Sequence, residues 1–198
     1  RSNLPLIETW DINHRPLDLI VGFSNYEAGY NITDYAIKKK YKKILFVTSS
    51  DKNMKVEVRG RKRLEGYVDR MTKKNYKHSN FQISDPLDYK KSGEEIFNYY
   101  KKNRSKIDCI ISFNEMTGLG FLSTALRNNV KIPEELGIAS IGNAEVSNLL
   151  DFKITTINTN QYEMGKLAAS KLIDRIKNVP FKKRIFDVGT SLVKGITL

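Results

Sequence analysis

Short apolar runs alternate along this chain with longer segments whose apolar residues recur every three or four positions. Residues 44–48 (ILFVT) and 109–113 (CIISF) are largely apolar throughout, which is typical of strands buried on both faces. Residues 58–76 instead place Leu64, Tyr67 and Met71 on one side of a helix. Since strand-like and helical segments take turns, the pattern predicts an α/β fold with a mainly parallel sheet.

The same patterns locate the remaining elements. We expect strands at residues 17–23, 81–83, 138–141 and 154–157, two more within 184–197, and helices at 25–40 and 161–177. Two further helices are expected to begin at polar capping residues, Ser92 with Glu95 and Asn114. In a parallel sheet of this kind, ligands bind outside the carboxyl ends of the strands.

Composition narrows the class of protein. The chain has 198 residues and a 40% hydrophobic share, enough to bury a core. Its single cysteine, Cys109, excludes an internal disulfide and suits a reducing cytoplasm. No apolar run approaches the roughly 18 residues that cross a bilayer.

The charge balance is strongly basic. The 34 basic and 22 acidic residues give a net charge of +12, which fits contact with nucleic acid or with an anionic ligand. Lysine-rich helix surfaces explain it equally simply, as at residues 38–40 and 73–74. We favour the surface explanation, because the lysines are scattered and no nucleic-acid motif accompanies them.

The residues that enzymes and metal sites need are sparse. His14 and His78 are far apart, and neither has a second ligand at metal-binding spacing. Cys109 lies within an apolar strand, the setting of an inert thiol. No phosphate-binding glycine loop or nucleophile elbow occurs. We therefore predict a protein that is not an enzyme and that has no metal and no cofactor.

Polar residues follow three of the predicted strands, and an arginine lies near the start of a predicted helix. Ser24, Asn114 and Asn143 each come after an apolar run, where neighbouring strand ends converge. Each is also a good helix cap, which explains any one of them alone. Arg63, near the start of a predicted helix, could grip hydroxyls or a carboxylate with its planar fork, or belong to a solvated basic patch.

Seven segments together resemble the core domain of the LacI family, close to its gluconate-operon-repressor branch. Their order and spacing agree over nearly the whole chain. The segments are LPLIETWD (4–11), VGFSNYEAG (21–29), RLEGY (63–67), FNE (113–115), IPEELGI (132–138), LDFKITTI (150–157) and YEMG (162–165).

The resemblance implies a periplasmic-binding-protein-like fold, with parallel sheets flanked by helices in two lobes that clamp a sugar or related metabolite. Residues 1–22 and 158–180 would form part of the N-terminal lobe, and residues 23–157 and 181–198 a nearly complete C-terminal lobe. It also implies a cytoplasmic homodimer that binds operator DNA through a headpiece missing from this chain. With much of one lobe absent, we expect weak effector binding by this chain alone.

The resemblance also implies an effector site. Arg63 matches the family arginine that grips the effector, and Asn114 matches an asparagine at a strand end. Asn143 replaces an aspartate that is frequent in the family, Trp10 and Ser24 also stand at frequent aspartate positions, and Thr159 replaces a frequent glutamine. This loss of acidic groups favours a sugar acid such as gluconate.

The resemblance leaves some assignments open. Tyr89 is a weaker candidate for the wall of the site, and Trp10 could stack on a sugar or simply pack. Leucines at the C-lobe dimer contact would be Leu119, Leu122, Leu149 and Leu150, of which the first two fit plain core at least as well. The alternative function is a periplasmic sugar-binding protein of a transport system, which shares the fold without a DNA role.

Overall fold

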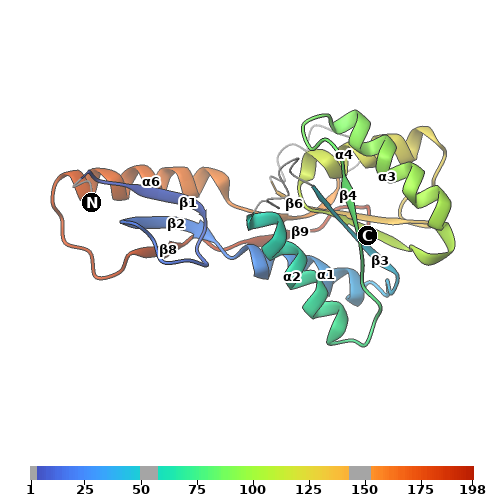
Figure 1. The fold of residues 1–198 in the computed structure, drawn as a ribbon, viewed down its shortest axis with the longest axis horizontal. Coiled ribbons are helices and arrows are strands. Elements are labelled where there is room, and N and C mark those ends of the chain that lie inside the picture. Colours follow the sequence, from blue (N-terminus) through green and yellow to red (C-terminus); the bar gives the residue numbers. More distant parts are fainter. Residues whose placement is uncertain (1–3, 50–57, 143–152) are drawn as a thin grey trace. The chain divides into compact units, whose positions relative to one another are not determined.

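The computed structural model describes residues 4–49, 58–142 and 153–198, and the chain divides into two compact units (Figure 1). Unit 1 comprises residues 1–24 and 159–191, and unit 2 comprises residues 25–158 and 192–198. Each unit has its own sheet.

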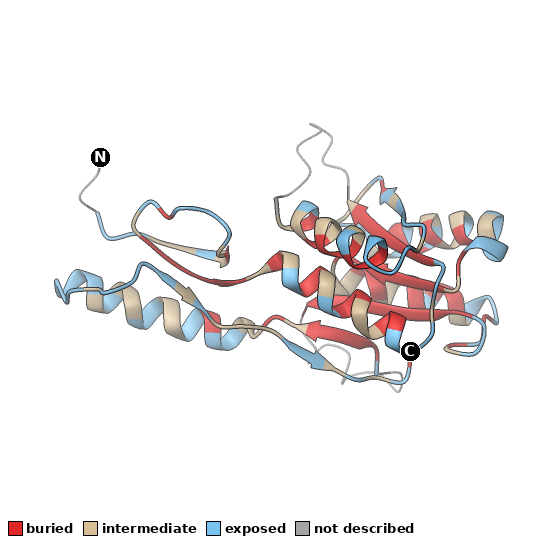
Figure 2. Ribbon diagram, turned by 90° about the horizontal axis from the view of Figure 1, so that it is seen from below, coloured by how far each residue is buried: buried red, intermediate tan, exposed pale blue. Residues whose placement is uncertain are grey.

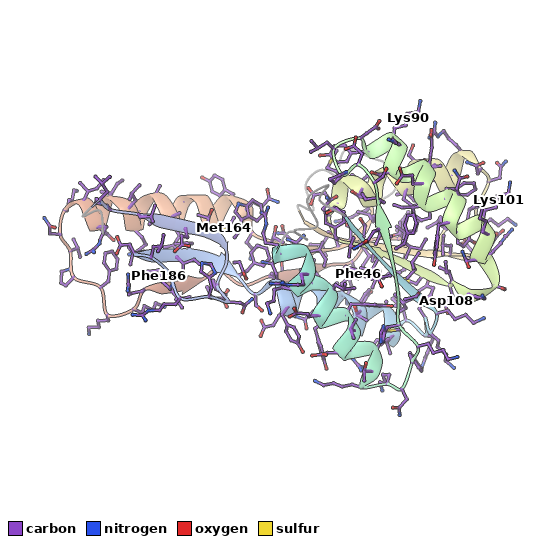
Figure 3. The ribbon with its side chains drawn as sticks, viewed as in Figure 1. Phe46, Lys90, Lys101, Asp108, Met164 and Phe186 are labelled. Atoms are coloured by element: carbon purple, nitrogen blue, oxygen red, sulfur yellow. The ribbon has the colours of Figure 1, made fainter. Side chains whose placement is uncertain are left out.

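Unit 1 is a small parallel sheet with one helix against it. Its strands β1 (Ile7–Asp11), β2 (Leu19–Phe23) and β8 (Ile185–Asp187) lie in the order β1-β2-β8, and both pairs are parallel. All five residues of the central strand β2 are buried. Helix α6 (Gln161–Ile176) packs on β1 and β2 with Met164 buried (Figure 3).

The described residues of unit 2 form a larger sheet. Its order is β4 (Ser79–Ile83), β3 (Ile44–Ser49), β5 (Cys109–Ser112), β6 (Gly137–Gly142), β7 (Thr155–Asn158) and β9 (Ser191–Val193). The pairs from β4 through β7 are all parallel. Strands β5 and β6 are buried at every residue, because helices cover both faces (Figure 2). The α/β fold expected from the alternating pattern is confirmed.

Among the described residues, four α-helices flank this sheet in two pairs. Helices α1 (Asn25–Lys38) and α2 (Val58–Thr72) lie together on one face, and α3 (Tyr89–Asn103) and α4 (Glu115–Arg127) on the other (Figure 1). A short 3-10 turn, η1 (Arg104–Lys106), follows α3. Within the described ranges, no helix has both the length and the apolar character that a membrane crossing requires.

Glycines let the helices of each pair touch backbone to backbone. A Cβ atom at Gly29 would lie 2.0 Å from the Arg63 carbonyl oxygen, and one at Gly66 would lie 2.1 Å from the Tyr26 carbonyl oxygen. On the other face, a Cβ atom at Gly93 would lie 2.3 Å from the carbonyl oxygen of Gly120. Side chains larger than hydrogen therefore do not fit at these crossings.

The strand order places a topological switch point beside β3. The chain leaves β3 for the edge strand β4, but it leaves β5 in the opposite direction for β6. The helices that follow β3 and β5 therefore lie on opposite faces, the arrangement for which open α/β sheets are expected to form a crevice at the carboxyl ends of these two strands. This is where a ligand site is expected in an open α/β sheet.

Two sequence-based expectations differ from the structure. Residues 181–191 were expected in the same lobe as residues 23–157, but β8 pairs with β2 in unit 1, and the chain passes to unit 2 only after Ser191. The helix expected to begin at Ser92 begins at Tyr89 instead. Asp88 caps it by accepting a hydrogen bond from the Lys91 amide, while the buried Ser92 hydroxyl donates to the Asp85 carbonyl.

Candidate functional site

Arg63 lies buried at the switch point. Its side chain is anchored from two directions: Nε donates to Asn25 Oδ1 at 2.9 Å, and a terminal nitrogen donates to the Phe113 carbonyl oxygen. The residue is only 7% exposed. The contact between Gly29 and the Arg63 backbone fixes the helix position from which this side chain extends. The expectation of a solvated basic patch is therefore wrong for Arg63.

Asn114 follows β5 and stands next to the carbonyl group that Arg63 binds. Its side-chain oxygen accepts from the Thr117 amide at 2.7 Å and caps α4, as the sequence predicted. Among the described residues, its side-chain nitrogen has no hydrogen-bond partner. The half-buried Asn114 therefore serves as a cap and also presents an amide donor at the end of β5.

Glu115 brings a carboxylate to the end of the neighbouring strand. A Cβ atom at Gly142, the last residue of β6, would lie 1.5 Å from Glu115 Oε2, so only glycine leaves room for this side chain. Asn143 follows directly in the sequence and lies outside the described residues. The carboxyl edge of the sheet therefore carries a carboxylate that can accept hydrogen bonds. The expectation of lost acidic groups, drawn from Ser24 and Asn143, did not include it.

A row of small hydroxyl residues lies under the first half of α4. Ser112, Ser140 and Thr156 are direct neighbours in register on β5, β6 and β7. A Cβ atom at Gly118 would lie 3.1 Å from the Ser140 Cβ and 3.4 Å from the Ser112 Cβ. The small side chains let α4 approach the sheet closely, and this holds Asn114 and Glu115 at the edge.

Three of the expected site residues belong to unit 1. Trp10 in β1 has a positive φ of 84°, and its ring meets the Phe23 ring edge-on at 6.3 Å. Ser24 directly follows β2 and is half-buried. Thr159 is fully buried, and its hydroxyl accepts a long hydrogen bond of 3.4 Å from Gln161. Their roles toward an effector stay predictions.

The remaining expectations concern α3, α4 and the segment after β6. Tyr89 is the half-buried first residue of α3, and its carbonyl oxygen would lie 2.2 Å from a Cβ atom at Gly120. Leu119 is half-buried, whereas Leu122 is 2% exposed and packs in the core of unit 2, so a dimer contact through Leu122 is wrong. The other two expected dimer residues, Leu149 and Leu150, lie outside the described residues.

Sequence reasoning missed Asn25 and Glu115. Asn25 is fully buried and orients Arg63, but in the sequence it stands next to Ser24 and was given no role of its own. Glu115 stands next to Asn114 in the first turn of α4, where an acidic residue also complements the helix dipole. The nearby Gly142 was the signal that a side chain lies across the end of β6.

The carboxyl edge of the unit 2 sheet presents groups that suit the binding of a polar ligand. Within the described ranges, no group of three or more His, Cys, Asp or Glu side chains is placed to hold a metal ion. Burial raises the pKa of the Cys109 thiol well above its ordinary value, and the neighbouring Asp108 adds to the shift, so the thiol stays protonated. What the edge does offer is a guanidinium, an amide donor and a carboxylate.

Comparisons with known proteins agree with this architecture. The periplasmic binding protein-like domain family matches residues 33–198. The HTH-type transcriptional regulator IdnR of Escherichia coli (strain K12) is 24% identical over 198 residues, which are 100% of this chain and 58% of that protein. The chain thus spans little more than half the length of this curated relative.

Solved structures of regulators share the fold. The transcription regulator GntR from Chromobacterium violaceum superimposes with a TM-score of 0.88 at 21% identity, covering 98% of this chain and 70% of that one. A periplasmic binding protein/LacI transcriptional regulator from Alkaliphilus metalliredigens QYMF, complexed with D-xylulofuranose, gives a TM-score of 0.82 at 22% identity over 98% and 70% of the two chains. The chain therefore belongs to the periplasmic binding protein-like family and is homologous to the effector-binding domains of LacI-family transcriptional regulators.

Proposed function

We propose that this chain is the effector-sensing part of a transcription repressor, and that it binds a sugar or sugar acid at the carboxyl edge of the unit 2 sheet. The observation that carries the proposal is the position of Arg63. Its buried guanidinium is fixed at the end of β5, next to the amide of Asn114. A guanidinium held there can donate to vicinal hydroxyls or to a carboxylate.

The mixture of donors and an acceptor suits a polyhydroxylated ligand. Arg63 and Asn114 supply donors, while the Glu115 carboxylate accepts from hydroxyl groups. Gluconate carries both a carboxylate for Arg63 and hydroxyls for Glu115, so a sugar acid remains the preferred effector. The related regulator from Alkaliphilus metalliredigens is complexed with the sugar D-xylulofuranose, which supports this ligand class.

The wider assignment follows the relatives, which are transcriptional regulators rather than enzymes. In this proposal, unit 1 is part of the N-terminal lobe and unit 2 a nearly complete C-terminal lobe, in a protein that works in the cytoplasm as a homodimer and binds operator DNA through a separate headpiece. The chain itself has no catalytic role. Trp10, Ser24, Thr159, Tyr89 and Asn143 are further effector contacts in this proposal.

The test is an NMR titration of the 198-residue chain with D-gluconate and with D-ribose, because NMR detects weak binding. We expect chemical-shift changes centred on Arg63 and Asn114. Arg63→Lys keeps the charge but loses the fork, and should weaken binding by about tenfold. Asn114→Ser keeps a capping oxygen but removes the amide donor, so it should weaken binding while α4 stays folded.

Lys90→Ala, on the exposed surface of α3, is the matched control and should bind as the parent does. Circular dichroism establishes that each variant is folded. Shift changes elsewhere on the chain, or folded Arg63→Lys and Asn114→Ser variants that bind as tightly as the parent, would refute the site.

A further inference from the structure

Unit 1 contains a shallow pocket that the proposed effector site does not use. Its walls come from the loop between β1 and β2 and from the segment that leads into β8. The lining residues are Ile12, Asn13, His14, Arg15, Pro16, Lys183, Arg184 and Ile185. None of them belongs to the group around Arg63.

The lining of this pocket is basic. Four of its eight residues are His14, Arg15, Lys183 and Arg184, and no acidic residue is among them. Like charges gathered in a concave surface repel one another and concentrate a positive potential there. Such a pocket attracts anions far more strongly than the same charges spread over a convex surface.

Acidic side chains in this part of the fold already have partners, and one of them, Asp11, accepts from the pocket-lining Asn13 at 2.9 Å. Glu8 Oε1 lies 3.0 Å from His14 Nε2, and Glu8 Oε2 accepts from the Leu17 amide. Asp18 accepts from Arg175 Nε at 2.9 Å and from the Leu6 amide. Burial alone would raise the pKa values of these two carboxyls, but their hydrogen bonds outweigh it and hold both below their ordinary values.

Arg184 is held in place by the backbone. Its Nε donates to the Asp18 carbonyl oxygen at 2.6 Å, and a terminal nitrogen donates to the Leu17 carbonyl oxygen at 2.7 Å. Carbonyl oxygens orient the guanidinium without neutralising it. Among the described residues, Arg184 forms an ion pair with Asp18. This contact is weak, because the terminal nitrogen lies 3.8 Å from Asp18 Oδ1.

Arg15 and Lys183 lack an acidic partner. In the described parts of the chain, neither side chain takes part in an ion pair. The Lys183 ammonium lies 5.2 Å from the centre of the Phe186 ring, a contact that leaves its charge in place. Two cations that have no ion-pair partner in the described parts of the chain therefore line the pocket together with Arg184.

We propose that this pocket binds a phosphate group. Arginine forks and a lysine ammonium are the donors that recognise the three oxygens of a phosphate, and the pocket presents both kinds from two converging segments. The phosphate can belong to a small phosphorylated metabolite or to a nucleic-acid backbone, since both present the same oxyanion. The proposal does not depend on the effector site.

The test compares two double variants of the 198-residue chain. Arg15→Ala/Lys183→Ala removes the two uncompensated cations. Lys90→Ala/Lys101→Ala removes the same net charge from α3 and is the control (Figure 3). Each protein is titrated by NMR with inorganic phosphate, with glucose 6-phosphate and with a 12-base-pair DNA duplex, against sodium chloride at equal ionic strength.

We expect the parent and the α3 control to show phosphate-dependent shifts in the pocket, and the pocket variant to bind at least about tenfold more weakly. If the metabolite binds in the pocket and the duplex does not, the source is a small molecule. If the duplex binds and only the pocket substitutions weaken duplex binding, the phosphate group belongs to a nucleic-acid backbone.

Equal binding by the two variants, or shifts that chloride reproduces, would overturn the proposal. Because Arg63 and Asn114 remain intact throughout, such a result leaves the effector site unaffected. Conversely, gluconate binding that Arg63→Lys does not change would refute only the effector site.

Discussion

At the scale of single residues, Tyr67 shows how one polar atom can tie several segments together. Its hydroxyl lies 2.7 Å from the Ile44 carbonyl oxygen and accepts from the Ser79 amide at 2.9 Å, so it links α2 to the starts of β3 and β4. Its ring stacks on Phe46 with the centroids 5.1 Å apart. Burial raises the pKa of Tyr67, so the hydroxyl stays protonated.

Tyr67→Phe should lower the free energy of unfolding by about 1–3 kcal/mol, because the substitution keeps the packing but removes the short hydrogen bond to the Ile44 carbonyl oxygen and the acceptor of the Ser79 amide. Urea unfolding followed by circular dichroism measures the change. Tyr162→Phe is the control: this side chain is 77% exposed, and its effect should stay within about 0.5 kcal/mol. Equal effects of the two substitutions would show that the hydroxyl contributes no stability.

Individual site residues were predictable where a local rule applies. Asn114 follows an apolar run and caps the next helix, which is visible in the sequence alone. The partners of Arg63 could not be predicted in this way. Asn25 and Phe113 lie 38 and 50 positions away from it and meet it only after the helices and the sheet have packed. Family resemblance supplied the role of Arg63, and packing supplied its geometry.

At the scale of elements, the crossing of α1 and α2 positions Arg63. The helices touch at Gly29 and Gly66, and Asp34 on α1 binds both Lys38 and Arg70 at 2.7 Å. Stacking of Tyr26 on Tyr30 and the Lys73 ammonium 4.9 Å from the Tyr30 ring add contacts along the same seam. A change that separates these helices should therefore also move the guanidinium.

Gly66→Ala should destabilise the chain by about 1–3 kcal/mol, because the added methyl would overlap the Tyr26 carbonyl and push the helices apart. Gly60→Ala in the same helix is the control. There the methyl meets no described atom within 4 Å, and the better helix propensity of alanine should stabilise by about 0.5–1 kcal/mol. Thermal unfolding measures the stability of both variants. We expect Gly66→Ala to be less stable than the parent and Gly60→Ala to be more stable.

The Asp34 ion pairs predict a pH dependence. Burial alone would raise the pKa of Asp34, but hydrogen bonds from Lys38 and Arg70 hold it below its ordinary value of 3.8. The carboxylate therefore contributes stability above about pH 4, and this contribution disappears as the pH falls through the lowered pKa. Asp34→Asn should destabilise at neutral pH and progressively less in acid. Unfolding of both proteins at a series of pH values measures this, and a difference that is independent of pH would contradict it.

Element types followed from periodicity, but their ends depended on local competition. The helix expected at Ser92 begins three residues earlier, since Asp88 takes the capping role and Ser92 is turned inward to the Asp85 carbonyl. Both residues are good caps in isolation. The burial of Ser92, which decides between them, is a tertiary property.

At the scale of the whole molecule, the two units differ in how much they bury. Among the sixteen residues of α6 in unit 1, Met164 is the buried one, whereas β5 and β6 in unit 2 are buried throughout (Figure 2). Amide hydrogens of β5 and β6 should therefore exchange only through global unfolding, and those of α6 through local opening, roughly a hundredfold faster or more. Hydrogen–deuterium exchange with mass spectrometry checks this, and equal protection would contradict it.

The division between the units was the hardest feature to predict. Two of the three positions where the chain passes between the units fall within two residues of the expected ones, because the largely buried strands β2 and β7 precede them. The third falls after Ser191 rather than near residue 180, since β8 has only three residues and no pattern to reveal that β2 is its partner. Short edge strands carry too few residues for their sheet to be read from sequence.

The double anchoring of Arg63 has a consequence for affinity. A free arginine side chain samples many rotamers, and restricting them on binding costs about 1.5–2 kcal/mol of conformational entropy. Here Asn25 and Phe113 already restrict the side chain in the folded chain, so that cost falls on folding. A ligand that reaches this guanidinium meets a preorganised donor and keeps more of its interaction energy as affinity.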